Sequence, residues 1–181
     1  FGYIKIIAGN MEALSKQRRF LDNDLNRIWS QQTLNLLQKG EVQPSIHEHY
    51  EMLKIWEQIE PLLAGSQPKY FVDLHTTSSP TSPFIAMDNT QENRDFALTF
   101  PVPVVSGLGS FVQQPLLSLM SEKGIPSMAF EAGPIEHNVS FKNHVAFLNL
   151  AAVAAGIVDR KGIRNYEQNQ EQLEAHARDP K

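Results

Sequence analysis

Asp73 and His75 lie two residues apart at the end of an apolar run, residues 70–75, that predicts a short buried strand. Side chains alternate along a strand, so both should project from one face at its C-terminal end. In an open α/β sheet that edge is where ligands bind. Neutral imidazole binds zinc well, and a nearby carboxylate can fix its tautomer. The pair predicts either a metal ligand at His75 or an ordinary hydrogen-bonded histidine at a strand end.

Glu131 occupies a similar position near the end of a second apolar run, Ser127-Met128-Ala129-Phe130. A carboxylate at the end of a buried strand is costly unless it is paired, associated with a metal or catalytic. Glu131 is therefore a candidate catalytic residue, and a structural ion pair is the alternative interpretation.

Residues 18–29 combine three arginines with several asparagines and aspartates, which suit neither a helix nor a strand, so we predict a loop. The planar guanidinium of Arg19 or Arg27 could bind a carboxylate or a developing oxyanion, with the aspartates holding it in place. A solvated surface loop without function is the alternative.

The remaining pattern supplies the elements that must position these side chains. Helices are expected over residues 30–39, 46–63, 90–100 and from 138 or 140 to 158, and a helical segment is expected to end at Lys123. The last long helix should bury Phe141, Val145, Leu148, Ala152, Ala155 and Val158. Further strands are expected over residues 3–8, 84–87 and 102–105, the last at a sheet edge because of its prolines. Strands alternating with helices predict an α/β architecture.

Length and composition narrow the class of protein. A chain of 181 residues with 41% hydrophobic and 20% charged residues is long enough for one globular domain. The net charge of -4 gives no reason to expect a nucleic-acid partner. No apolar run approaches the length of a membrane span. The absence of cysteine excludes disulfides and thiolate nucleophiles but leaves the compartment open, with cytoplasmic as the default.

The two ends of the chain predict a partial domain. The sequence begins with Phe1 and enters a strand-like stretch at once, which suggests an internal fragment. We interpret residues 1–159 as part of a catalytic α/β domain. Residues 160–181 are mostly polar and charged, so we expect an exposed helix, a tail or a linker toward a further domain.

Three motifs taken together resemble the succinylglutamate desuccinylase/aspartoacylase family. They are Asp22-Asn23-Asp24-Leu25-Asn26-Arg27, Asp73-Leu74-His75-Thr76-Thr77 and Phe130-Glu131-Ala132-Gly133-Pro134, in the order and at the separations of that family. The resemblance covers most of residues 1–158. It implies a zinc carboxypeptidase-like fold of the phosphorylase/hydrolase type, with a mixed, mostly parallel sheet flanked by helices.

The resemblance also implies a reaction, which is hydrolysis of the amide bond of an N-acyl amino acid with one zinc ion. By this analogy His75 is the third zinc ligand, and Glu131 is the general base that later protonates the leaving amine. Arg19 polarises the scissile carbonyl. Asn26 and Arg27 bind the substrate carboxylate. Asp73 orients His75, an inference from strand geometry.

The sequence also departs from the family pattern. The family's first two zinc ligands come from a His-x-x-Glu pair upstream of the first strand seen here, and no such pair occurs in these 181 residues. A β-rich C-terminal domain, which caps the substrate site in the family, is also missing.

Three hypotheses of function follow. The first is a zinc-dependent deacylase that acts on small N-acyl amino acids. The sequence is compatible with a homo-oligomer but does not specify one. The second is a carboxypeptidase-like metallopeptidase of the same fold. The third, motivated by the missing His-x-x-Glu pair, is a catalytically silent α/β domain that serves in binding or regulation.

Overall fold

One mixed sheet organises the computed structural model, which describes residues 2–107, 112–135 and 138–178. Within these residues the strands lie in the order β1-β4-β2-β3. Strand β1 runs parallel to β4 and β2 runs parallel to β3, whereas β2 and β4 are antiparallel. The expected mixed, mostly parallel α/β sheet is confirmed. The strands are β1 (Phe71–Thr77), β2 (Phe84–Met87), β3 (Val104–Ser106) and β4 (Ser127–Pro134).

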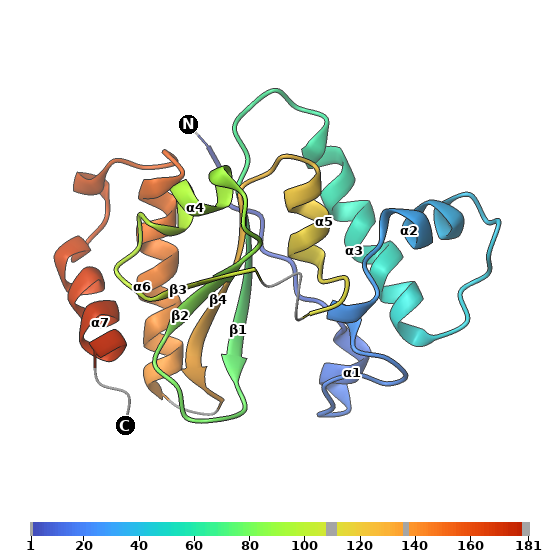
Figure 1. The fold of residues 1–181 in the computed structure, drawn as a ribbon, viewed down its shortest axis with the longest axis horizontal. Coiled ribbons are helices and arrows are strands. Elements are labelled where there is room, and N and C mark those ends of the chain that lie inside the picture. The colour runs from blue at the N-terminus through green and yellow to red at the C-terminus, as the bar shows by residue number, and fades with distance from the viewer. Residues whose placement is uncertain (1, 108–111, 136–137, 179–181) are drawn as a thin grey trace.

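Helices cover both faces of this sheet. In Figure 1, α6 and α7 lie on one side of the sheet, and α3 and α5 lie on the other. The helices are α1 (Met11–Ser15), α2 (Gln31–Gln38), α3 (His47–Leu63), α4 (Gln91–Ala97), α5 (Leu116–Glu122), α6 (Asn138–Ala154) and α7 (Tyr166–Arg178), with short 3-10 turns at Leu25–Arg27 and Arg160–Gly162. No helix in the described ranges has the length and apolar character needed to cross a bilayer.

Local capping explains where two helices begin. The Ser30 hydroxyl accepts a hydrogen bond from the Thr33 amide at 3.0 Å, and the Thr90 hydroxyl accepts one from Asn93 at 3.2 Å. Each satisfies an amide that the first turn of a helix leaves without a partner. The expected helix starts near residues 30 and 90 are therefore confirmed.

The two faces of β4 contribute to two cores. Met128 and Phe130 are fully buried in the core formed with α6, where Phe130 stacks on Phe147 with ring centroids 4.1 Å apart. The intervening Ala129 faces the other layer and packs with Leu117 of α5. This alternation fixes the register of β4. It places Glu131 opposite His75 of β1 in the parallel ladder.

The predicted strand over residues 3–8 is absent. The segment has no regular structure, and the side chains of Tyr3, Ile4 and Ile6 are 50–77% exposed. A strand is stable only when a neighbour pairs with its backbone groups, and β1 pairs with β4 alone among the described strands. Apolar, β-branched residues were therefore insufficient for a strand.

The predicted buried face of the last long helix is only partly confirmed: Ala152 is buried as expected, and Leu148, Ala155 and Val158 are half-buried. Phe141 is 71% exposed and Val145 is 43% exposed, whereas the helix buries Asn143, Ala146, Phe147 and Leu150. Apolar residues surround α6 on most sides, so their spacing does not single out the face that meets the sheet.

The polar tail contributes a packed helix. Leu173 of α7 is fully buried in the core that also contains Phe147 and Leu150 of α6. We expected an exposed helix or a linker, but Leu173 docks this helix on the core together with the partly buried Tyr166 and Ala177. Helix α7 therefore belongs to the folded unit.

Candidate functional site

Asp73 and His75 are in direct contact at the end of β1. The His75 Nε2 atom lies 2.9 Å from Asp73 Oδ2, and both side chains are partly buried. Because a carboxylate only accepts, Nε2 carries the proton of this hydrogen bond. Burial alone would lower the pKa of His75, but the Asp73 carboxylate raises it overall. The expected contact between the two side chains is thus present, and this tautomer leaves Nδ1 as the nitrogen with a lone pair.

Asn26 joins this pair from the loop before α2. Its Nδ2 donates to Asp73 Oδ2 at 2.9 Å and lies 3.3 Å from His75 Nε2. Its Oδ1 accepts from the Leu116 amide at 3.0 Å. The loop, β1 and the start of α5 therefore meet at one side chain. Asn26, which the sequence assigned to substrate binding, is engaged here in contacts within the protein.

Glu131 lies beside His75 on the neighbouring strand. Its Oε2 atom is buried and has no hydrogen-bond partner among the described residues. Burial raises the pKa of Glu131, and Asp73 adds to this, although His75 and Arg19 oppose it. A buried carboxylate oxygen without a partner normally carries an energetic penalty, so it marks a place where a ligand, water or metal is expected. No salt bridge to Glu131 is present within the described residues, although the charges of His75 and Glu131 act on each other's pKa.

Arg19 is close enough to influence both ionisable groups. It lowers the pKa of His75 and of Glu131 through its charge. Its Nε and Nη2 atoms donate to Asp24 Oδ2 at 3.0 and 2.7 Å, and 67% of the side chain is exposed. Asp24 thus holds one side of the guanidinium, as expected, and no bond from Nη1 to a described residue is present.

Arg27 is less closely tied to this group. Its Nη1 donates to the carbonyl oxygen of Asn26 at 2.8 Å, and its side chain is exposed. The structure therefore brings together Asn26, His75 and Glu131 and places Arg19 within electrostatic reach, whereas Arg27 is exposed and bonded only to the backbone of Asn26 among these residues.

His144 is a site neighbour that the sequence did not indicate. It projects from α6, and its Nε2 atom lies 3.0 Å from the carbonyl oxygen of His75. A carbonyl accepts, so Nε2 is the donor. Burial lowers the pKa of His144. The contact falls where the pairing of β1 with β4 shifts register, between His75 and Thr77. No motif marks this residue, because only the packing of α6 on the sheet creates the contact.

The donors for a metal are incomplete in the described part of the chain. No group of three histidine, cysteine, aspartate or glutamate side chains there could hold a metal ion. His75, with Nε2 bound to Asp73 and Nδ1 available, fits one ligand position. A catalytic zinc usually has three protein ligands, so His75 alone does not make a site.

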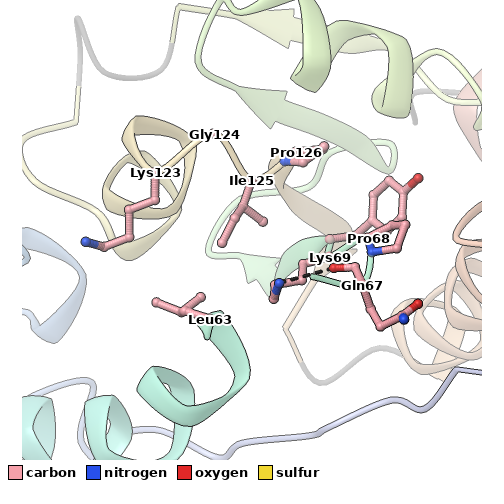
Figure 2. A pocket seen from close by; sticks show the side chains of 9 residues that line it. Leu63, Gln67, Pro68, Lys69, Lys123, Gly124, Ile125 and Pro126 are labelled. Carbon is pink, nitrogen blue, oxygen red and sulfur yellow. Dashed lines mark hydrogen bonds between the residues drawn. The ribbon is translucent and has the colours of Figure 1, made fainter. Parts of the chain in front are cut away.

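A pocket at a different place in the fold is lined by none of these side chains. It measures about 560 Å³ and is lined by residues that precede β1 and β4, such as Tyr70 and Pro126. Figure 2 shows Leu63 and Lys123 on its other side, at the ends of α3 and α5. This is the opposite end of the two strands from His75 and Glu131. None of the five predicted site residues lines it.

Comparison with known proteins decides the family. A family model described as the succinylglutamate desuccinylase/aspartoacylase catalytic domain matches residues 3–115, which is more than half of the chain. The chain belongs to this family. The match contains the motifs around Asn26 and His75, and Glu131 lies beyond it.

Solved structures of the family share the fold. Succinylglutamate desuccinylase from Chromobacterium violaceum is 14% identical, with a TM-score of 0.57 over 86% of this chain and 49% of that one. The succinylglutamate desuccinylase/aspartoacylase from Rhodobacter sphaeroides is 16% identical, with a TM-score of 0.57 over 82% of this chain and 43% of that one.

The succinylglutamate desuccinylase from Vibrio cholerae is 13% identical, with a TM-score of 0.59 over 83% of this chain and 44% of that one. The chain therefore spans less than half the length of these relatives. A search among curated proteins found no match.

Proposed function

We propose that this protein is a zinc-dependent hydrolase that cleaves the amide bond of an N-acyl amino acid. Membership of the family supports a deacylase. The observation that carries the proposal is Glu131, whose buried Oε2 has no partner in the described residues and lies next to His75. A raised carboxyl pKa suits a group that must take a proton and later return it.

The proposal includes zinc because the imidazole of His75 is a suitable zinc ligand. Nδ1 of His75 is the donor offered, Asp73 fixes the tautomer, and the other ligands would have to lie outside the described residues. When bound, zinc supplies Lewis acidity, which makes a water molecule more acidic and a carbonyl more electrophilic.

Glu131 is proposed to move the proton. Its free carboxylate oxygen accepts a proton from the attacking water, and the same group then gives that proton to the nitrogen of the leaving amine. No proton is gained or lost over the cycle, so one carboxyl group serves both steps. Partial burial keeps the group away from competing bulk water.

Arg19, Asn26 and Arg27 are proposed to bind the substrate. The free side of the Arg19 guanidinium would offset the charge that develops on the carbonyl oxygen, while Asp24 restrains the other side. Arg27 is exposed next to Asn26, so its guanidinium would be available to the carboxylate of an amino acid. Asn26 would have to share its amide between that carboxylate and Asp73.

The test compares the wild type with Glu131→Gln on a panel of N-acyl amino acids and of peptides with a free C-terminus. Glu122→Gln is the matched control, because Glu122 is exposed at the end of α5. We expect E131Q to lower kcat by about 10²–10⁴-fold and E122Q to leave it unchanged. Unchanged hydrolysis by E131Q would show that its assigned role is wrong.

Native mass spectrometry provides a readout that does not depend on turnover. We expect one zinc per wild-type chain and none in His75→Ala. A wild type with neither zinc nor turnover would favour the silent binding or regulatory domain, for which the incomplete ligand set in the described residues is the motivating observation.

A further inference from the structure

The loop that carries Arg19, Asn26 and Arg27 has little regular structure of its own. Between α1 and α2 it contains one 3-10 turn, Leu25–Arg27. Asp24 accepts from the Asn26 amide at 3.0 Å at the start of that turn. Upstream of Asp24, the conformation of the loop must be set by contacts with other elements.

Glu48 of α3 supplies those contacts. Its side chain is fully buried at 0% exposure, and its two oxygens accept hydrogen bonds from the backbone amides of Leu21 at 2.7 Å, Asp22 at 3.2 Å and Asn23 at 3.1 Å. Asn10 Nδ2 donates to the same carboxylate at 3.2 Å. Burial would raise the pKa of Glu48, but these donors hold it below its usual range. The buried charge is therefore matched by polar groups of the loop.

The loop binds α3 in return. Asp22 Oδ2 accepts from the amide of His47 at 2.8 Å and from the ring Nδ1 of His47 at 2.8 Å. The residue that precedes α3 is Ile46, whose side chain cannot cap the helix. Asp22 thus satisfies one amide of the first turn from a distant part of the chain. The first turn of α3 and residues 21–23 are therefore joined by two sets of hydrogen bonds, those of Glu48 and those of Asp22.

We propose that Glu48 is a positioning residue that fixes residues 21–23 and thereby places Arg19 on one side of them and Asn26 with Arg27 on the other. The proposal rests on the proposed function, because the placement matters only if these three residues bind substrate. The hydrogen bonds of Glu48 within the described residues go to Asn10 and to the amides of residues 21–23, not to a predicted site residue. Glu48 acts through the backbone of the segment between Arg19 and Asn26.

The test uses Glu48→Gln in the full chain, with Glu51→Gln as the matched control. Glutamine keeps the size of the side chain but offers one oxygen where the loop needs two. Glu51 lies one turn along α3, is also buried at 5% exposure, and accepts from Met11 and Lys54 but not from residues 21–23. Any general effect of removing a buried charge from α3 should appear in both variants.

We expect E48Q to reduce kcat/KM for an N-acyl amino acid by roughly 10- to 100-fold, because small displacements of binding groups are costly, and E51Q to stay near the wild type. KM should rise because Arg27, which is proposed to bind the substrate carboxylate, is displaced. kcat should fall because Arg19, which is proposed to act on the carbonyl oxygen, is displaced as well. Hydrogen exchange should accelerate at the amides of residues 21–23 in E48Q, while the amides of β1 and β4 keep their protection.

Two results would overturn the proposal. One is exchange at residues 21–23 that is unchanged in E48Q. The other is exchange that accelerates equally throughout the chain, with activity lost in proportion to the unfolded fraction. If E48Q does not fold, Glu48→Asp tests the same contact, because it keeps the charge but shortens the reach to the amides of residues 21–23, and the same local acceleration is expected.

The exchange measurement separates this proposal from the proposed function. If the wild type hydrolyses no member of the panel, the proposed function fails. Faster hydrogen exchange at residues 21–23 in E48Q would still support the conclusion that Glu48 fixes the conformation of the loop. If the wild type is active and E48Q shows local acceleration with unchanged kinetics, the positioning role is wrong and the proposed function stands.

Discussion

Glu131 combines a destabilising environment with the chemistry proposed for it. Burial raises the pKa of its carboxyl group, and Oε2 lacks a partner in the described residues. Polar groups left unsatisfied inside a protein reduce stability, and such groups gather at sites where activity requires them. The same residue should therefore limit stability and support catalysis.

Glu131→Gln should be more stable than the wild type at neutral pH. The folded-state pKa of Glu131 is raised, so the folded wild type favours the protonated carboxyl and loses stability as pH rises from the unfolded pKa through the folded pKa. Below about pH 4.3 the carboxyl is protonated in both states, and the advantage of E131Q should disappear. Melting temperatures of both proteins between pH 4 and pH 8 check this. A difference that stays constant with pH would contradict it.

Single residues also show which contacts the sequence motifs predicted and which they did not. The alternation of side chains along a strand predicted that Asp73 and His75 share a face, and they lie 2.9 Å apart. Asn26 was selected by its motif alone, and its bonds to Asp73 and to the Leu116 amide could not be predicted. Glu48 has a weak sequence signal, because it lies four residues before buried Met52 and seven before buried Ile55 on the same helix.

Helix α6 shows why an element can be predicted while its orientation is not. It begins at Asn138, as expected, and ends at Ala154, four residues before the expected end at residue 158. Its apolar residues surround most of the helix, so the periodicity that marks an amphipathic helix is weak. The contact between Phe147 and Phe130 of β4, at 4.1 Å, selects the buried face.

Two phenylalanines on α6 provide a matched test of that face. Phe147 is fully buried, whereas Phe141 is 71% exposed. We expect Phe147→Ala to lower the free energy of unfolding by about 3–5 kcal/mol, through lost burial and the cavity left behind. Phe141→Ala should change it by less than about 0.5 kcal/mol. Urea unfolding of both variants decides between the two faces, and the reverse order of effects would restore the face expected from sequence.

On the scale of the molecule, α7 extends the folded unit beyond the boundary expected at residue 159. The helix is polar over most of its length, but Leu173 is fully buried against α6. Burial of Leu173, with Tyr166 and Ala177 packed on the same core, offsets the entropy of ordering a mostly polar segment.

Leu173→Ala should therefore destabilise the whole chain. We expect a loss of about 2–5 kcal/mol in the free energy of unfolding, typical of a buried leucine. Leu98→Ala is the control, because Leu98 is 67% exposed at the end of α4, and it should cost less than about 0.5 kcal/mol. Denaturant unfolding followed by circular dichroism measures both. Equal stability of L173A and the wild type would mean that α7 is a dispensable tail.

The sequence by itself determined local features, because these depend on neighbours in the chain. It determined the class of fold, the starts of α2 and α4, the strands that carry His75 and Glu131, and the family motifs. It failed for residues 3–8, since a strand also needs a partner strand.

Tertiary structure alone decided which distant residues meet. The order β1-β4-β2-β3 places Glu131 beside His75, and the packing of α3 on the arginine loop joins Glu48 to Leu21 and Asn23. Such contacts depend on how whole layers pack, and no spacing along the chain records that packing.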